Sequence, residues 1–257
     1  QQLARKALAP GVRVSGHGIE VGRLVPFLVG NYKVRVKPGG HGLDHAVLLQ
    51  HQHPLRLIVG LKKIVHIGPV ISKGQIPQFT QPGDILVMSG SLAAGMEKDS
   101  YGRILKHLKG RGIHAVVDTA GESLGSALPY RPFLVKPNHL ELGAFFGREL
   151  KTAEDVESCA RELRLMGAEN VLVSMGGDGA LLVDGTGKCY RVAAPQGKVV
   201  STVGAGDSMV AGFLAGWLAT GDYAQALKLG TAAGSATAFS LGLADARAIE
   251  EVLASMG

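Results

Sequence analysis

The chain has 257 residues, 46% of them hydrophobic and 5% aromatic, so it can bury one sizeable core without a disulfide or a structural metal. This composition excludes a disordered chain, and the absence of any stretch near the roughly 18 apolar residues of a spanning helix indicates a cytoplasmic protein with no membrane partner. The net charge of +6 comes from residues 1–80, which hold 11 basic and two acidic side chains; the other residues hold 16 basic and 19 acidic side chains. Because this basic segment has no recognised nucleic-acid motif and no interleaved aromatic residues, we do not expect nucleic acid binding.

Residues 1–80 form an irregular basic segment in which no period of 2 or 3.6 lasts for long. One exception is Tyr32–Val36, which alternates as a half-buried strand would. Further along the chain, Cys159 and Cys189 have no CxxC spacing, and we interpret both as reduced, buried and inert thiols.

From residue 81 to 257 the pattern becomes regular. Apolar runs predict strands at residues 85–88, 115–117, 133–135 and 171–174. Helical spacing predicts helices near residues 101–108, 153–166, 205–220 and 222–240, and residues 180–194 read as a hairpin. This alternation predicts an α/β fold with a mostly parallel sheet covered on both faces and ligands at the carboxyl ends of its strands.

A glycine-rich loop precedes the helix predicted at residue 205. Small residues there would let the backbone N–H groups of Gly204, Ala205 and Gly206 approach a phosphoryl group, and Asp207 would accept the proton of the attacking hydroxyl. On these residues alone, the glycines could equally make a plain turn, with Asp207 as a helix cap. The loop matches neither GxGxxG nor GxxxxGK[ST], the two common nucleotide loops.

Four motifs together resemble those of the PfkB (ribokinase-like) carbohydrate kinases, in family order and with family spacing. They are SGSL at residues 89–92, VKPN with Glu141 at 135–141, SMGGDG at 174–179 and STVGAGDSMVAGF at 201–213. Within the family, STVGAGDSM and the DTAGE stretch at 118–122 are similar to the branch of 1-phosphofructokinase and tagatose-6-phosphate kinase.

The resemblance implies a ribokinase-like three-layer fold with a small β lid, and it implies roles for the matched residues. Asp207 would be the catalytic base, and Gly204, Ala205 and Gly206 would form the anion hole. Nucleotide-binding residues would be Lys136, Asn138, Glu141, Ser174, Met175, Gly176, Gly177, Asp178, Gly179, Thr202, Ala233 and Gly234. Asn138 and Glu141 would also help to hold Mg²⁺, and Ser89 and Gly90 would contact the substrate.

Two of these motifs also have a purely structural explanation that involves no ligand. Asn138 and Glu141 also fit a helix start with an acid in its first turn, and Ser174–Gly179 also fits an ordinary loop.

The family's usual opening, a strand with a substrate-binding Asp followed by a GGKGxN loop, is not reproduced in residues 1–80. Gly39–Asp44 resembles that loop only partly, with His in place of Lys and Asp in place of Asn. A better fit to the family places Leu3–Val14 before the lid, Tyr32–Val36 in a lid strand and Gly68–Ser72 before the next helix. The first βαβ unit would then be missing. A diverged but complete site, or a wrongly assigned sequence before about residue 67, are the alternatives.

The expected function is phosphorylation of a hexose phosphate with ATP and Mg²⁺, converting fructose 1-phosphate to fructose 1,6-bisphosphate. Alternatives are tagatose-6-phosphate or 6-phosphofructokinase activity, or a non-catalytic module that binds nucleotide or sugar phosphate. Lys33 or Arg35 could hold the substrate phosphate, which needs a cationic partner. Because family lids often pair across a dimer, we also expect a homodimer.

Overall fold

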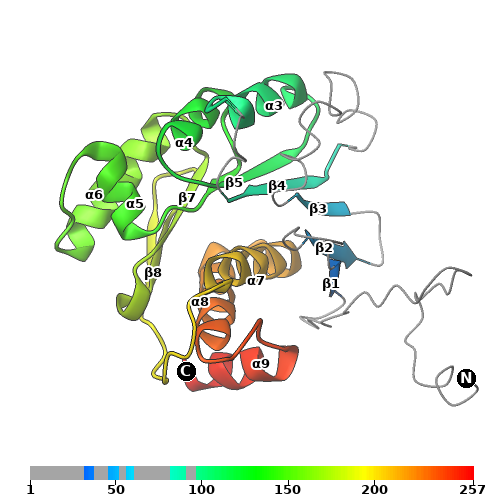
Figure 1. The fold of residues 1–257 in the computed structure, drawn as a ribbon, viewed down its shortest axis with the longest axis vertical. Coiled ribbons are helices and arrows are strands. Elements are labelled where there is room, and N and C mark those ends of the chain that lie inside the picture. Colours follow the sequence, from blue (N-terminus) through cyan, green and yellow to red (C-terminus); the bar gives the residue numbers. More distant parts are fainter. Residues whose placement is uncertain (1–31, 38–45, 52–55, 61–81, 91–96) are drawn as a thin grey trace, which may run out of the picture.

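The computed structural model describes residues 32–37, 46–51, 56–60, 82–90 and 97–257, which form a sheet with helices on both faces (Figure 1). The strands are β1 Tyr32–Lys37, β2 Ala46–His51, β3 Arg56–Gly60, β4 Ile85–Ser89, β5 His114–Asp118, β6 Leu134–Val135, β7 Asn170–Ser174, β8 Ala180–Val183 and β9 Cys189–Val192. They lie side by side in chain order; β3 to β7 run parallel, and the strands at both ends are antiparallel. The predicted mostly parallel sheet is confirmed.

The helices form the two outer layers. They are α3 Ser100–Leu108, α4 Gly121–Ala127, α5 His139–Phe146, α6 Ala153–Leu165, α7 Ala205–Thr220, α8 Tyr223–Ala238 and α9 Ala246–Ser255, with short 3₁₀ turns η2 Leu128–Tyr130 and η3 Gly176–Asp178. Sequential parallel strands joined by crossovers of one hand have their helices on one face, and α3 to α6 share a single core cluster there. After the β8–β9 hairpin, α7 to α9 cover the other face (Figure 1).

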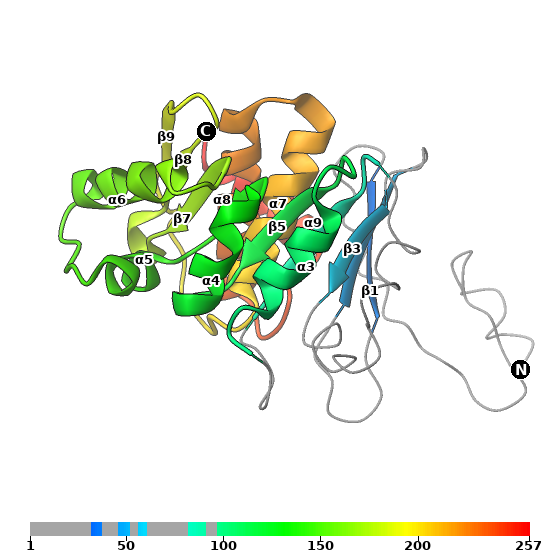
Figure 2. The same ribbon diagram turned by 90° about the horizontal axis from the view of Figure 1, so that it is seen from above.

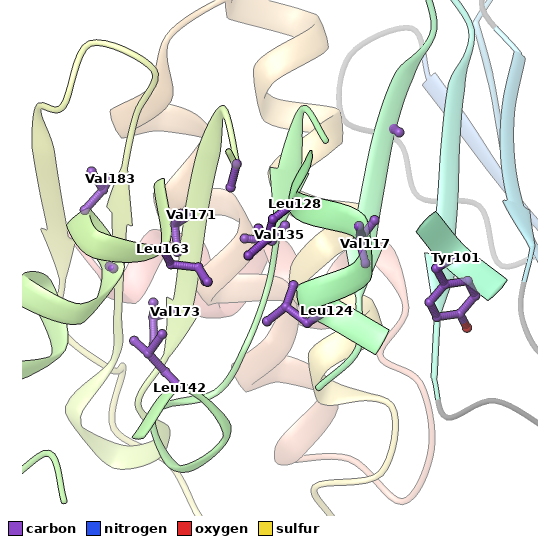
Figure 3. Packing of buried hydrophobic residues seen from close by; sticks show 14 of the residues in the cluster. Tyr101, Val117, Leu124, Leu128, Val135, Leu142, Leu163, Val171, Val173 and Val183 are labelled. Atoms are coloured by element: carbon purple, nitrogen blue, oxygen red, sulfur yellow. The ribbon is translucent and has the colours of Figure 1, made fainter. Parts of the chain in front are cut away.

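Alternation along the strands divides the core between these two faces. Ile85 and Val87 of β4 pack in the cluster that contains α7 and α8, whereas Leu86 and Met88 pack with α3 to α6. Figure 3 shows the second cluster, in which Val117, Val135, Val171 and Val173 meet leucines from the covering helices. Strands β4 to β8 are therefore buried on both faces, and their sequences are nearly continuous apolar runs.

The first three strands continue the sheet beyond β4, on the side away from the hairpin (Figure 2). The strand expected at Tyr32–Val36 is β1, whose register pairs Lys33 with Gln50 and Arg35 with Leu48. In the described residues β1 belongs to the main sheet, so a lid separate from that sheet stays a prediction. The stretches Leu3–Val14, Gly39–Asp44 and Gly68–Ser72, for which sequence made further predictions, lie outside the described residues.

The predictions about the cysteines and about membrane-spanning segments can be compared with the described part of the chain. Neither Cys159 nor Cys189 is in a disulfide; Cys159 is buried and Cys189 half-buried. None of the helices in the described ranges is both long and apolar enough to cross a membrane.

Candidate active site

Polar side chains gather where three neighbouring parallel strands end. Ser89 closes β4 and is in register with Asp118, which closes β5, and Lys136 follows β6 directly. The Lys136 N–H donates to the Val117 carbonyl at 3.1 Å, which keeps the third strand end level with the second. The carboxyl edge of the sheet thus presents a hydroxyl, a carboxylate and an ammonium group side by side.

The glycine-rich loop brings Asp207 to this edge from the other end of the sequence. Gly204 is the N-cap of α7 with a φ of +80°, a left-handed conformation that favours glycine. The helix start has no side-chain cap, so the alternative in which Asp207 is the cap is wrong. Asp207 Oδ1 instead accepts a hydrogen bond from Ser89 Oγ at 2.9 Å.

Lys136 lies beneath this loop and is paired with Asp118. Its Nζ is 3.1 Å from Asp118 Oδ1, and both side chains are largely buried. A Cβ on Gly206 would lie 3.1 Å from the same Nζ, so the ammonium sits against the backbone of the predicted anion hole. One of the predicted donors is already engaged, because the Ala205 N–H donates to the Thr202 carbonyl at 3.2 Å.

The acidity of Asp118 reflects its surroundings. Burial raises the pKa of this carboxyl from its ordinary 3.8 to about 6; the Lys136 ammonium opposes the shift, and the negative charges of Asp207 and Glu141 add to it. The charged form of Asp118 is therefore a cost to the folded state.

This cost predicts a pH dependence of stability. The folded state binds the Asp118 proton more tightly than the unfolded chain, so this group stabilises the fold below about pH 4 and loses that contribution as pH rises through about 6. Relative to Asp118→Asn, the free energy of unfolding of the wild type should fall by roughly 3 kcal/mol or less over that window. Urea titrations of both proteins at several pH values measure the two free energies of unfolding. A difference between them that does not change with pH would contradict the raised pKa of Asp118.

Asn138 and Glu141 form a capping box at the start of α5. The Glu141 N–H donates to Asn138 Oδ1 at 2.8 Å, and the Asn138 N–H donates to Glu141 Oε2 at 2.9 Å. The purely structural role, a helix start with an acid in its first turn, is therefore present in the fold. It does not exclude a second role, because Glu141 also lines a cavity with Asp118 and Asp207.

That cavity has a volume of about 410 Å³ and opens over the strand ends. Its lining residues are Ser89, Gly90, Asp118, Thr119, Ala120, Ser123, Glu141, Gly206 and Asp207. Five of these carry predicted roles: Ser89, Gly90, Glu141, Gly206 and Asp207. The structure therefore brings the predicted base, part of the phosphate loop and the strand-end residues to one concave site.

The donor set of the cavity fits Mg²⁺ held jointly with phosphate. Within the described ranges, no cluster of three or more His, Cys, Asp and Glu side chains could hold a metal ion alone. Carboxylates at Asp118, Glu141 and Asp207 are hard oxygen ligands, and Mg²⁺ commonly uses one or two of these together with substrate phosphates and water. The predicted amide oxygen of Asn138 is engaged in the capping box.

Several other predicted residues lie away from the cavity. The Ser174–Gly179 loop follows β7 and closes on itself, with the Met175 N–H donating to the Gly179 carbonyl at 2.8 Å; Asn138 is bridged to Ser174. Ala233 and Gly234 lie in the contact between α8 and α7, where a Cβ on Gly234 would lie 3.1 Å from the Ala205 carbonyl oxygen. Their assignment to the nucleotide stays a prediction, as does that of Thr202.

Sequence reasoning did not include Asp118, Thr119, Ala120 or Ser123 among the site residues. Asp118 carried a usable signal, because it is an acid directly after an apolar strand, beside the strand that ends at Ser89. Its pairing with Lys136 was not visible in the sequence, since the two residues are 18 positions apart with helix α4 between them.

Comparison with known proteins gives one family. Residues 71–249 match the model of the pfkB family carbohydrate kinases. Over 192 residues the chain is 42% identical to the 1-phosphofructokinase of Bacillus subtilis, covering 72% of this chain and 63% of that protein. It is 37% identical to the D-tagatose-1-phosphate kinase of Bacillus licheniformis, covering 74% of this chain and 64% of the relative. The chain therefore spans a little less than two thirds of the length of both relatives.

A solved structure resembles the described fold. The phosphofructokinase-2 from Escherichia coli in complex with fructose-6-phosphate has a TM-score of 0.65 and 32% sequence identity, over 81% of this chain and 66% of that one.

Proposed function

Because the chain belongs to the pfkB family of carbohydrate kinases, we propose that it transfers the γ-phosphoryl group of ATP to a hydroxyl of a hexose phosphate. The observation that carries this proposal is the position of Asp207. It lies exposed in the first turn of α7, at a cavity that also holds the strand-end residues. A base, helix-start N–H groups and a buried lysine are among the groups that phosphoryl-transfer enzymes use.

The reaction balances with these groups. The acceptor hydroxyl loses its proton to the Asp207 carboxylate while its oxygen forms a bond to the γ-phosphorus, and the bond from that phosphorus to the departing ADP oxygen breaks. Backbone N–H groups at the start of α7 stabilise the charge on the phosphoryl oxygens. Mg²⁺, when bound with ATP, would neutralise phosphate charge, and Glu141, one of three carboxylates that line the cavity, would help to hold it.

Fructose 1-phosphate is the proposed acceptor, with O6 as the attacking oxygen. The DTAGE and STVGAGDSM stretches and the 42% identity to a 1-phosphofructokinase support it. A coupled assay of ADP release with fructose 1-phosphate, fructose 6-phosphate, tagatose 6-phosphate and tagatose 1-phosphate tests the choice. The highest kcat/KM should belong to fructose 1-phosphate, and a clear preference for another sugar would replace it.

A second candidate is a binding module without turnover. The observation that favours it is that residues 1–80 do not reproduce the GGKGxN loop with which members of the family hold the sugar. ADP release no faster than the background hydrolysis of ATP with every sugar, together with measurable nucleotide binding, would support this alternative.

The substrate phosphate needs a cation, and we propose Lys33 or Arg35 for this contact. Both residues belong to β1, two positions apart, and phosphate groups are commonly bound by lysine or arginine side chains. Arg35→Ala or Lys33→Ala should raise the KM for the sugar phosphate at least about tenfold, the loss of one charge-assisted contact. Arg247→Ala, which removes an exposed cation from α9, is the control. An unchanged KM in both variants would contradict the contact.

A homodimer is the proposed assembly. In the described residues β1 pairs with β2 alone and forms the edge of the sheet, and an unpaired edge exposes backbone donors and acceptors. Light scattering at micromolar concentration should give twice the mass of the chain; a monomer would contradict it.

A further inference from the structure

We propose that Ser89 is a positioning residue for Asp207: its hydroxyl holds one carboxylate oxygen of the base, so that the other oxygen receives the proton of the acceptor. This inference rests on the proposed function. It replaces the role of substrate contact that the motif suggested for Ser89. The observation behind it is the 2.9 Å hydrogen bond from Ser89 Oγ to Asp207 Oδ1, which joins residues 118 positions apart in the chain.

A serine hydroxyl has one hydrogen, so it can serve one carboxylate at a time. Ser89 Oγ lies 2.9 Å from Asp207 Oδ1 and 3.5 Å from Asp118 Oδ2, and the shorter contact marks Asp207 as the acceptor. Asp118 has its own partner, because its Oδ1 is 3.1 Å from Lys136 Nζ. Because Lys136 satisfies Asp118, the Ser89 hydroxyl can donate its hydrogen to Asp207.

Ser89 is itself fixed in place, as a positioning residue must be. The Gly90 N–H donates to the Asp118 carbonyl at 2.8 Å. The buried Tyr101 hydroxyl lies 3.1 Å from the Gly90 carbonyl and 3.3 Å from the Ser89 carbonyl. Only 5% of Ser89 is exposed, so its hydroxyl has little access to solvent as an alternative partner.

Asp207 needs this support because it is otherwise poorly constrained. The residue is exposed, and its helix start makes no side-chain cap. If the Asp207 carboxylate rotates away from the acceptor hydroxyl, it can no longer take the proton, and even small errors in its position lower the rate by large factors. A hydrogen bond that only orients the base contributes to the transition state and not to the binding of ATP or sugar, so the effect of losing it should fall on kcat.

The test is a kinetic comparison of Ser89→Ala, Ser89→Thr and the control Ser126→Ala. Ser89→Ala should lower kcat on the order of 10- to 100-fold with both KM values nearly unchanged, and Ser89→Thr should recover much of the loss because it keeps the hydroxyl. Ser126→Ala removes a hydroxyl of α4 that donates to the Ser123 carbonyl and accepts from the Gly102 N–H. It lies outside the cavity lining, so kcat and both KM values should stay unchanged. A raised sugar KM at unchanged kcat, or wild-type kcat in Ser89→Ala, would overturn the proposal.

A double-mutant cycle on stability separates this inference from the proposed function. Urea midpoints of Ser89→Ala, Asp207→Ala and the double variant report coupling between the two side chains without any turnover. We expect the effect of Ser89→Ala to shrink when Asp207 is absent. Additive effects would show that the hydrogen bond is not made and would overturn the positioning role. A wild type that turns over none of the sugar phosphates refutes the kinase proposal, while the cycle still decides the contact.

Discussion

Replacing Asp207 by Asn is expected to lower kcat by a factor of roughly 10² or more and to leave nucleotide affinity nearly unchanged. The amide keeps the shape of the side chain and can still accept a hydrogen bond from Ser89 through its oxygen, but it cannot take the proton of the attacking hydroxyl. The N–H groups at the start of α7 remain in place, so binding of the phosphates persists.

Steady-state kinetics and calorimetric titration with ADP measure these two effects. Asp99→Asn is a matched control: Asp99 is also an exposed Asp at a helix start, makes no side-chain cap, and stands outside the cavity lining. It should leave both quantities unchanged. Turnover of Asp207→Asn within threefold of wild type would remove Asp207 from the role of base.

Removal of Mg²⁺ by excess chelator is expected to abolish turnover, with a loss of at least about 10²-fold. The cavity has carboxylates at Asp118, Glu141 and Asp207, and the lysine beside it, Lys136, is already paired with Asp118. The nucleotide triphosphate and a phosphorylated sugar add further negative charge, which a divalent cation must offset.

Added Mg²⁺ should restore the rate, whereas an equal ionic strength of a monovalent salt should not. Glu141→Gln should raise the Mg²⁺ concentration that gives half-maximal rate, because it removes the carboxylate proposed for the cation. Full activity in excess chelator would contradict the role of the metal.

Hydrophobic pattern and motif spacing were enough to predict much of the fold from the sequence. The hairpin expected at residues 180–194 is β8 and β9, and the two long helices expected after residue 204 are α7 and α8. These elements have strong local signals, since the turn is Asp-Gly-Thr-Gly and glycine lies at both ends of α7. The continuation of the sheet into β2 and β3 had no such signal.

The site was predictable only as a set of separate motifs. Asp207 and Ser89 each belonged to a motif, but their hydrogen bond depends on how α7 meets the end of β4, which no local pattern encodes. The role of Gly206 as the neighbour of the Lys136 ammonium was hidden for the same reason. By contrast, the helix start at Asn138 with Glu141 in its first turn is local, and the sequence predicted it as an alternative; the structure adds the reciprocal capping box.

Phosphoryl transfer itself is the central claim, and ³¹P NMR of the products tests it most directly. ATP, Mg²⁺, fructose 1-phosphate and the protein should give ADP and a sugar with two phosphomonoester signals, in equal amounts and without inorganic phosphate. Release of inorganic phosphate alone, or no loss of the γ-phosphate signal with any of the four sugar phosphates, would contradict the assignment of this chain as a sugar-phosphate kinase.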